Sequence, residues 1–271
     1  MLVKPMVRIV EGRHPCLGSE VIPNNLLLGC EELPARCVVV TGPNMGGKST
    51  LMRQTALIAL LAHLGCKVPA DQCELTPIDR IFTRLGASDR LLAGESTFMV
   101  ELSECASILR HSTPHSLILM DELGRGTSTH DGSALASSVL HYLAEAAPRC
   151  LFSTHYHTLV DGQERQSKIG MGHMACMVEE PLADAGGDKS GLDFETVHFL
   201  YKFVPGQCPK SYGFNAARLA QIPDKITRYA VRKAREFEKV STTFTVLRDL
   251  LKAEDLSPDR LQQFRKRLDI V

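Results

Sequence analysis

Neither sign of charge is in excess in this sequence. Lys and Arg total 31 and Asp and Glu total 31, so the formal net charge is zero. A free-standing nucleic-acid-binding protein usually carries a basic excess. The composition therefore does not indicate a DNA-binding protein, and any DNA contact must be local or belong to another part of a larger protein.

Long apolar runs are also missing. The longest run, Ala56 to Ala62, is far too short to cross a bilayer. The first residues, MLVKPMVRIV, lack the apolar segment of a secretory signal peptide. We therefore expect no association with a membrane.

The nine cysteines include no CxxC pair, and nine is an odd number. A disulfide framework and a common zinc-binding pattern are both disfavoured. Cys37, Cys150 and Cys176 lie inside apolar runs, where a cysteine behaves as a small buried hydrophobic residue. We expect reduced cysteines in a cytosolic or nuclear protein.

What the sequence does contain is an alternation of apolar strands and helices. The chain has 271 residues, 44% of them hydrophobic, enough for one large α/β domain and a small appendage. The alternation predicts a mostly parallel, doubly wound sheet flanked by helices. The expected strands are Cys37–Thr41, Ser116–Met120 and Cys150–Thr154, and the expected helices are Lys48–Leu64, Ser96–His111 and a helix capped by Asp131 that ends near Leu143.

The C-terminal third changes character after Pro209. Before it, two further strands are expected to pair across a surface loop; after it, mixed-charge helices are expected. We place the boundary at Ile222-Pro223, giving domains 1–222 and 223–271, and find no repeat of fixed period. The expected strands are His173–Val178 and Phe194–Val204, the loop is Glu180–Asp193, and the helices are Asn215–Ala220, Asp224–Val240, Phe244–Lys252 and a last one to Leu268 with Ser257 as N-cap and Pro258 first.

A glycine-rich turn follows the first buried strand. It fits the pattern G-x-x-x-x-G-K-[ST], in which backbone N–H groups and the helix N-terminus cradle phosphates, the lysine adds positive charge and the serine binds Mg²⁺. The alternative is a glycine-rich turn without a ligand. The residues are Gly42, Pro43, Asn44, Met45, Gly46, Gly47, Lys48 and Ser49.

Two acidic residues end the second buried strand. Ligands in open α/β sheets lie at the carboxyl ends of strands. Asp121 is suited to the Mg²⁺ shell, and Glu122 is placed to orient and deprotonate an attacking water. The alternative is that both residues only cap the next turn.

His155 ends the third buried strand. A histidine there can contact a γ-phosphate or the attacking water, or it can be an ordinary surface histidine. A zinc site with His157 is a third possibility, but no CxxC pattern supports it.

Four motifs, in this order, resemble one family. TGPNMGGKST, ESTFMVEL, DELGRGTST and FSTHYH resemble the ATPase domain of the MutS family of DNA mismatch-repair proteins, over about Val38 to Arg218. FTRLGASDR, GHMACMVE and CPKSYGFNAARLA are most similar to the mismatch-recognition subunit of the eukaryotic heterodimer.

The resemblance implies a P-loop NTPase of the ABC-ATPase type that uses ATP and Mg²⁺ in a composite dimer. It makes Gly42 to Thr50 the Walker A loop, Asp121 and Glu122 the Walker B pair, and Ser49 and Asp121 the Mg²⁺ ligands. The remaining implied roles are catalytic base for Glu122, γ-phosphate sensor for His155, contact with the partner's nucleotide for Ser96, adenine stacking for Tyr201, and a loop crossing the interface for Thr127, Ser128 and Thr129.

Partners and location also follow from the resemblance. It implies a second MutS-type subunit, of the MutS homolog two type, a nuclear location, and mismatched double-stranded DNA bound by domains that this chain lacks. We therefore expect a part of a longer protein. The C-terminal helices resemble a dimer-stabilising tail. A solvated charged face is the alternative, and the mixed sign of the charges disfavours a DNA contact.

Two other functions are alternatives to a mismatch-repair ATPase. A transport motor of the ABC class carries an LSGGQ signature, and GESTF stands in its place here. A nucleotide-binding scaffold without turnover would be expected to have lost Lys48 or Glu122, and both are present.

Overall fold

The computed structural model describes residues 4–18, 20–86, 97–156, 159, 168–179, 196–208, 212–251, 253, 257, 261, 262, 264 and 265. The chain forms two compact units. The first comprises Met1–Val178 and Val197–Ser211, and the second comprises Glu179–Thr196 and Tyr212–Val271. The functional division at Ile222-Pro223 stays a prediction.

A six-stranded sheet forms the centre of the first unit. The neighbours from β5 to β8 pair in parallel, so the prediction of a mostly parallel sheet is confirmed. Thr196–Pro205 lies next to Ile169–Glu179, so the expected pairing of the two late strands is also confirmed. The strand order is β5 (Ile81–Arg84), β6 (Leu117–Asp121), β7 (Arg149–Ser153), β3 (Cys37–Thr41), β8 (Ile169–Glu179) and β9 (Thr196–Pro205).

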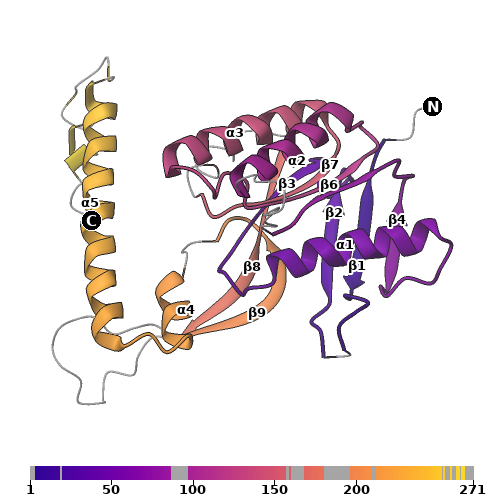
Figure 1. Cartoon of the computed structure of the whole chain (residues 1–271), viewed down its shortest axis with the longest axis horizontal. Coiled ribbons are helices and arrows are strands. Elements are labelled where there is room, and N and C mark those ends of the chain that lie inside the picture. The colour runs from indigo at the N-terminus through magenta and orange to yellow at the C-terminus, as the bar shows by residue number, and fades with distance from the viewer. Residues whose placement is uncertain are drawn as a thin grey trace. The chain divides into compact units, whose positions relative to one another are not determined.

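Helices cover both faces of this sheet (Figure 1). Alternate residues of one strand enter different cores: Val39 packs with α2 (Thr97–His111) and α3 (Thr129–Ala146), and Val38 packs with α1 (Lys48–His63). This alternation follows from the two-residue period of a strand, and it requires strands that are apolar on both faces. Cys37–Thr41 is buried throughout, as expected.

A second, antiparallel sheet of three strands packs into the same core as α1. Its order is β2 (Asn24–Leu28), β1 (Val7–Gly12) and β4 (Gln72–Leu75). Turn residues within 1–36 predict short strands and turns there, but no local pattern predicts Gln72–Leu75 or Ile81–Arg84. Both missed strands have only four residues, which is too short for a periodic signal.

Arg149 ties these layers together. It is fully buried, and its guanidinium donates to the carbonyl oxygens of Met6, Thr76, Pro77 and His115 and to the Thr76 hydroxyl. Burial lowers its pKa to about 10, which still leaves it a cation at neutral pH. Among the residues that the structure describes, no carboxylate forms an ion pair with Arg149, so the backbone carbonyls solvate its charge.

Three helix expectations need correction. The N-cap of α3 is Ser128, whose hydroxyl accepts from the Asp131 N–H, so Asp131 lies in the first turn and Thr129 begins the helix. The second half of α1 is apolar almost all round in the sequence, which predicts a buried helix, but Leu60 and His63 are exposed. Asp224–Val240 and Phe244–Lys252 are not separate helices.

The second unit contains α4 (Gly213–Leu219) and one long helix, α5 (Asp224–Leu251). The chain between Val240 and Phe244 does not break α5, because it holds neither Gly nor Pro and Thr243 bonds back to the Lys239 carbonyl at 2.8 Å. The expected loop Glu180–Asp193 lies outside the described residues, as does most of the last predicted helix.

The cysteine expectations are partly correct. Cys37 and Cys150 are buried, whereas Cys176 is only half-buried. In the part of the chain that the structure describes, we find no helix with both the length and the apolar character to cross a membrane.

Candidate functional site

The site lies where β3, β6 and β7 end. These strands are neighbours and parallel, so their carboxyl ends share one edge of the sheet. The glycine-rich loop follows β3, Asp121 ends β6, and His155 lies two residues beyond β7. Residues that are far apart in the sequence therefore meet at one edge, as the sequence predicted for strand-end residues.

Left-handed backbone shapes the loop after β3. Gly42 and Gly47 have φ of 128° and 100°, and Met45 has φ of 71°. The Gly46 N–H closes a turn by donating to the Pro43 carbonyl at 3.1 Å. A side chain at Gly42 would be strained by its φ, and its Cβ would lie 3.1 Å from Met174. The glycines thus fold the loop tightly over the start of α1.

The first turn of α1 has no side-chain cap and no acidic residue, and its N-cap is Gly47. The N-terminal end of a helix carries partial positive charge and N–H groups without intrahelical partners. An end without a carboxylate suits an external anion such as a phosphate.

Lys48 lies beneath this loop. Its side chain is buried at 6% exposure, and its ammonium donates to the carbonyls of Gly42 at 2.9 Å and Pro43 at 3.3 Å. Burial lowers the pKa of Lys48, while the carboxylates of Glu122 and Asp121 act to raise it. The lysine is thus held against the loop, where its positive charge would help to bind phosphate.

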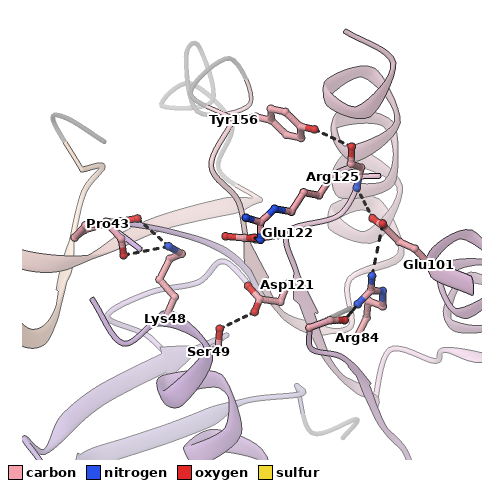
Figure 2. Close-up of polar contacts among 12 residues, drawn as sticks. Pro43, Lys48, Ser49, Arg84, Glu101, Asp121, Glu122, Arg125 and Tyr156 are labelled. Atoms are coloured by element: carbon pink, nitrogen blue, oxygen red, sulfur yellow. Dashed lines mark hydrogen bonds and ion pairs between the residues drawn. The ribbon is translucent and has the colours of Figure 1, made fainter. Parts of the chain in front are cut away.

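Ser49 joins the loop to β6. Its hydroxyl donates to Asp121 at 2.6 Å between Oγ and Oδ2 (Figure 2). A serine oxygen and a carboxylate oxygen are hard ligands of the kind that Mg²⁺ takes alongside phosphate oxygens. The side chains present therefore fit a Mg²⁺ ion that binds together with a nucleotide.

Glu122 has a strained backbone, with φ of 51°. Its N–H donates to the Ser153 carbonyl at 3.0 Å, which holds it against the end of β7. Its carboxylate pairs with Arg125 at 2.6 Å and is largely buried. A non-glycine residue in this region persists only where its surroundings fix it, and such positions cluster at functional sites.

A cavity of about 410 Å³ brings most of these groups together. Its volume suits a nucleotide-sized ligand. The loop, both carboxylates and Arg125 line it. The lining residues are Pro43, Asn44, Met45, Gly47, Lys48, Ser49, Thr50, Gly86, Asp121, Glu122 and Arg125.

A second cavity, of about 280 Å³, shares Met45, Gly47 and Thr50 with the first. Tyr201 lines it and is 46% exposed. Its remaining lining is Leu17, Glu20, Val21, Ile22, Asn24, Leu51, Gln54 and Met174. An aromatic ring and apolar side chains beside a phosphate-binding loop can hold a nucleobase.

Asn24 fixes the backbone around Tyr201. Its amide donates to the Tyr201 carbonyl at 3.0 Å and accepts from the Phe203 N–H at 2.6 Å. In the sequence, Ile22-Pro23-Asn24-Asn25 predicts only a turn. The partner of Asn24 lies 177 residues away, and no local pattern reveals such a contact.

One predicted site residue, His155, stands apart from the larger cavity, and another, Ser96, is not described. His155 is exposed and does not line the larger cavity; its ring lies 4.2 Å from that of Tyr156. Ser96 lies outside the described residues. No role was predicted for Arg125 from the sequence. Arg125 lies within the DELGRGTST motif, and a cation three residues after a glutamate could have indicated its ion pair with Glu122.

Comparison with known proteins gives one consistent result. A family model described as MutS domain V matches residues 38–238. The chain is 52% identical to the DNA mismatch repair protein Msh6 of Homo sapiens, over 98% of this chain and 20% of that protein. It is 54% identical to Msh6 of Gallus gallus, over 93% of this chain and 19% of the relative. A probable Msh6 of Drosophila melanogaster is 51% identical, over 88% and 20%. The chain thus spans about a fifth of the length of these relatives.

Proposed function

Since the chain belongs to the MutS family, we propose that it is the ATPase module of a DNA mismatch-repair protein of the Msh6 type. Its fold is then a P-loop NTPase of the ABC-ATPase type. One observation carries the proposal: Ser49 bonds to Asp121 at 2.6 Å, beside Lys48 and Glu122, in a cavity of about 410 Å³. That combination suits a nucleoside triphosphate bound with Mg²⁺.

The loop and Lys48 bind the phosphates. Backbone N–H groups of the non-proline residues from Gly42 to Thr50 and the N-terminus of α1 face the phosphate oxygens, and the ammonium of Lys48 adds a positive charge. Ser49 and Asp121 hold Mg²⁺, which neutralises charge on the phosphate oxygens when it is bound. Asn44, an exposed residue of the loop, contacts the γ-phosphate region.

Glu122 acts as the general base. It orients the attacking water and accepts its proton, which a carboxylate next to the Mg²⁺ ligand can reach. Arg125 holds one oxygen of this carboxylate at 2.6 Å, and the other oxygen is the one that we assign to the water. His155, from the end of the neighbouring strand, senses the γ-phosphate.

Tyr201 stacks on the adenine. The cavity of about 280 Å³ supports this role because it adjoins the phosphate loop and presents the Tyr201 ring. Apolar contacts from Leu17 and Ile22 bury the opposite face of the base. The hydrogen bonds of Asn24 keep this wall in place.

The site is completed by a second subunit. Ser96, ahead of α2, contacts the nucleotide of the partner, and the loop of Thr127, Ser128 and Thr129 crosses the interface. Residues 1–222 form the ATPase domain, and residues 223–271 form a helical tail that stabilises the dimer. Large apolar side chains of α5 support the tail's role, with Phe237 at 70% exposure and Leu251 at 85%.

The partner that we expect is a MutS-type subunit of the homolog two type, in the nucleus. Mismatched DNA is bound by other parts of a protein about five times as long. ATP binding assembles the two ATPase sites and hydrolysis resets them, so the energy changes the conformation of a clamp on DNA.

The direct test is the ATPase rate of this chain alone and mixed with a MutS-type partner. We expect a slow rate for the chain alone and a large increase on mixing, because the partner supplies the serine equivalent to Ser96 that contacts this chain's nucleotide. A partner carrying a substitution at its own signature serine is the matched control and should give no increase. Absence of Mg²⁺-dependent hydrolysis in both conditions would contradict the proposal.

A further inference from the structure

Hydrogen bonds hold the backbone of Gly124 from two sides. Gly124 lies two residues after Glu122, and its N–H donates to a carboxylate oxygen of Glu101. Its carbonyl accepts from the Tyr156 hydroxyl at 2.9 Å (Figure 2). Gly124 has φ of 90°, and an added Cβ would lie 2.5 Å from the Gly132 carbonyl oxygen, so only glycine fits this position.

Glu101 lies at the beginning of the second turn of α2. It is 3% exposed, and its other oxygen lies 3.6 Å from the guanidinium of Arg84 on β5. A buried carboxylate is costly unless it is paired and hydrogen-bonded, and here both conditions are met. Because α2 begins at Thr97, directly after Ser96, Glu101 joins the start of this helix to the loop that follows Glu122.

Tyr156 lies three residues beyond the end of β7, next to His155. It is 7% exposed, and its N–H donates to the Thr154 hydroxyl at 3.0 Å. Burial raises the pKa of Tyr156, and the charges of Glu101 and Glu122 raise it further. The phenol therefore keeps its proton at neutral pH and can donate it to Gly124.

These contacts explain how Glu122 stays in a strained conformation. A left-handed backbone at a glutamate is strained and persists only where its surroundings restrain it. The Ser153 carbonyl fixes the N–H of Glu122, and the two bonds to Gly124 fix the chain just beyond it. Loss of either bond releases the C-terminal side of this restraint.

We propose that the backbone of Gly124 is a junction through which Glu101 and Tyr156 position Glu122. Glu101 and Tyr156 are then positioning residues for hydrolysis. The inference rests on the proposed ATPase function. It connects the helix that follows Ser96 and the segment that carries His155 to the general base. A displacement of that helix or of that segment moves the backbone of Gly124, and with it the Glu122 carboxylate.

Tyr156→Phe is the sharpest test, because it removes one oxygen and keeps the ring. We expect kcat of the full chain, measured with the partner that gives maximal wild-type hydrolysis, to fall about tenfold. KM for ATP and the affinity for a non-hydrolysable ATP analogue should change less than about threefold, since loss of positioning affects the transition state more than binding. Tyr142→Phe, at an exposed tyrosine of α3, is the matched control and should keep the wild-type kcat.

Glu101→Gln is the second variant. It keeps the shape and one acceptor oxygen but loses the charge that pairs with Arg84, so kcat should also fall with little change in KM. If Glu101 and Tyr156 both act through the backbone of Gly124, kcat of the double variant should fall by less than the product of the two single losses. Glu145→Gln, at an exposed glutamate, controls for the charge change.

The outcomes separate this inference from the proposed function. A hydrolysing wild type with full kcat in Tyr156→Phe and in Glu101→Gln overturns the junction only. Strictly multiplicative losses, or a parallel loss of nucleotide affinity and melting temperature, also overturn it. A wild type that binds ATP but hydrolyses none in either condition overturns the proposed function and the junction with it.

Discussion

The Ser49 hydroxyl donates a 2.6 Å hydrogen bond to the carboxylate of Asp121, across 72 residues of sequence. The bond joins the first turn of α1 to the end of β6, two elements that are brought together by the strand order β6-β7-β3. Both oxygens are ligands of the kind that Mg²⁺ takes, as the proposed nucleotide site requires.

Ser49→Ala tests this pair. We expect the Mg²⁺ concentration for half-maximal hydrolysis to rise by at least about tenfold, because a ligand oxygen is lost. A Mg²⁺ titration of the ATPase rate measures it. Ser49→Thr keeps the hydroxyl and should stay near the wild type, and Ser138→Ala, on the exposed side of α3, should have no effect. An unchanged Mg²⁺ midpoint in Ser49→Ala would remove Ser49 from the metal site.

Glu122→Gln should separate binding from turnover. We expect ATP affinity to stay within about twofold, while the single-turnover hydrolysis rate falls roughly 10²–10⁴-fold through loss of the general base. ATP should then accumulate in a stable dimer, which size-exclusion chromatography with labelled nucleotide detects. Glu145→Gln provides the matched control. Wild-type turnover in Glu122→Gln would exclude Glu122 as the base.

Lys48→Ala should weaken ATP binding by roughly 10–100-fold, the range for losing a hydrogen bond between charged groups. Equilibrium binding of a fluorescent ATP analogue measures the loss, and the exposed Lys67→Ala is the control. Unaltered affinity in Lys48→Ala would contradict the phosphate-loop assignment.

The pH dependence of wild-type binding gives a separate test of Lys48. Because burial lowers the pKa of Lys48, affinity should begin to fall at a lower alkaline pH than an ordinary lysine would cause. The direction follows from the cation being the binding form, which is lost as the pH rises through the lowered pKa. Lys48→Arg should move this loss to higher pH; the same alkaline profile in wild type and Lys48→Arg would disprove the link.

Tyr201→Ala should act on the nucleobase. Base–aromatic stacking contributes roughly 1–3 kcal/mol, so KM for ATP should rise about 10–100-fold with kcat near the wild-type value. Steady-state kinetics with ATP measure both constants. Tyr142→Ala serves as the control, and an unchanged KM in Tyr201→Ala would place the base elsewhere.

Arg149→Met should destabilise the fold. It leaves buried carbonyl oxygens of Thr76, Pro77 and His115 without their donor, which costs about 3–5 kcal/mol in total. Thermal unfolding should shift down by roughly 10 °C. Arg53→Met, at an exposed position of α1, should shift it little. A midpoint unchanged by Arg149→Met would show that the carbonyls find other partners.

Much of the sheet was predictable from local patterns. The strand at Cys37–Thr41 was predicted to the residue, and those ending in Asp121 and Ser153 to within one, because a buried parallel strand is a short run of apolar residues between turns. The N-cap of α3 was misplaced, since Ser128 and Asp131 are both good capping residues and only the backbone at Ser128 distinguishes them.

The sequence by itself determined the chemical groups of the site. The spacing of Gly42, Gly47, Lys48 and Ser49 predicts a phosphate-binding loop, and Asp121-Glu122 marks a strand end, because both patterns depend only on neighbouring residues. The tertiary structure alone decided how separated groups meet. Ser49 with Asp121, Asn24 with the carbonyl of Tyr201, and Glu101 with Gly124 are contacts set by strand order and helix packing, which no local pattern encodes.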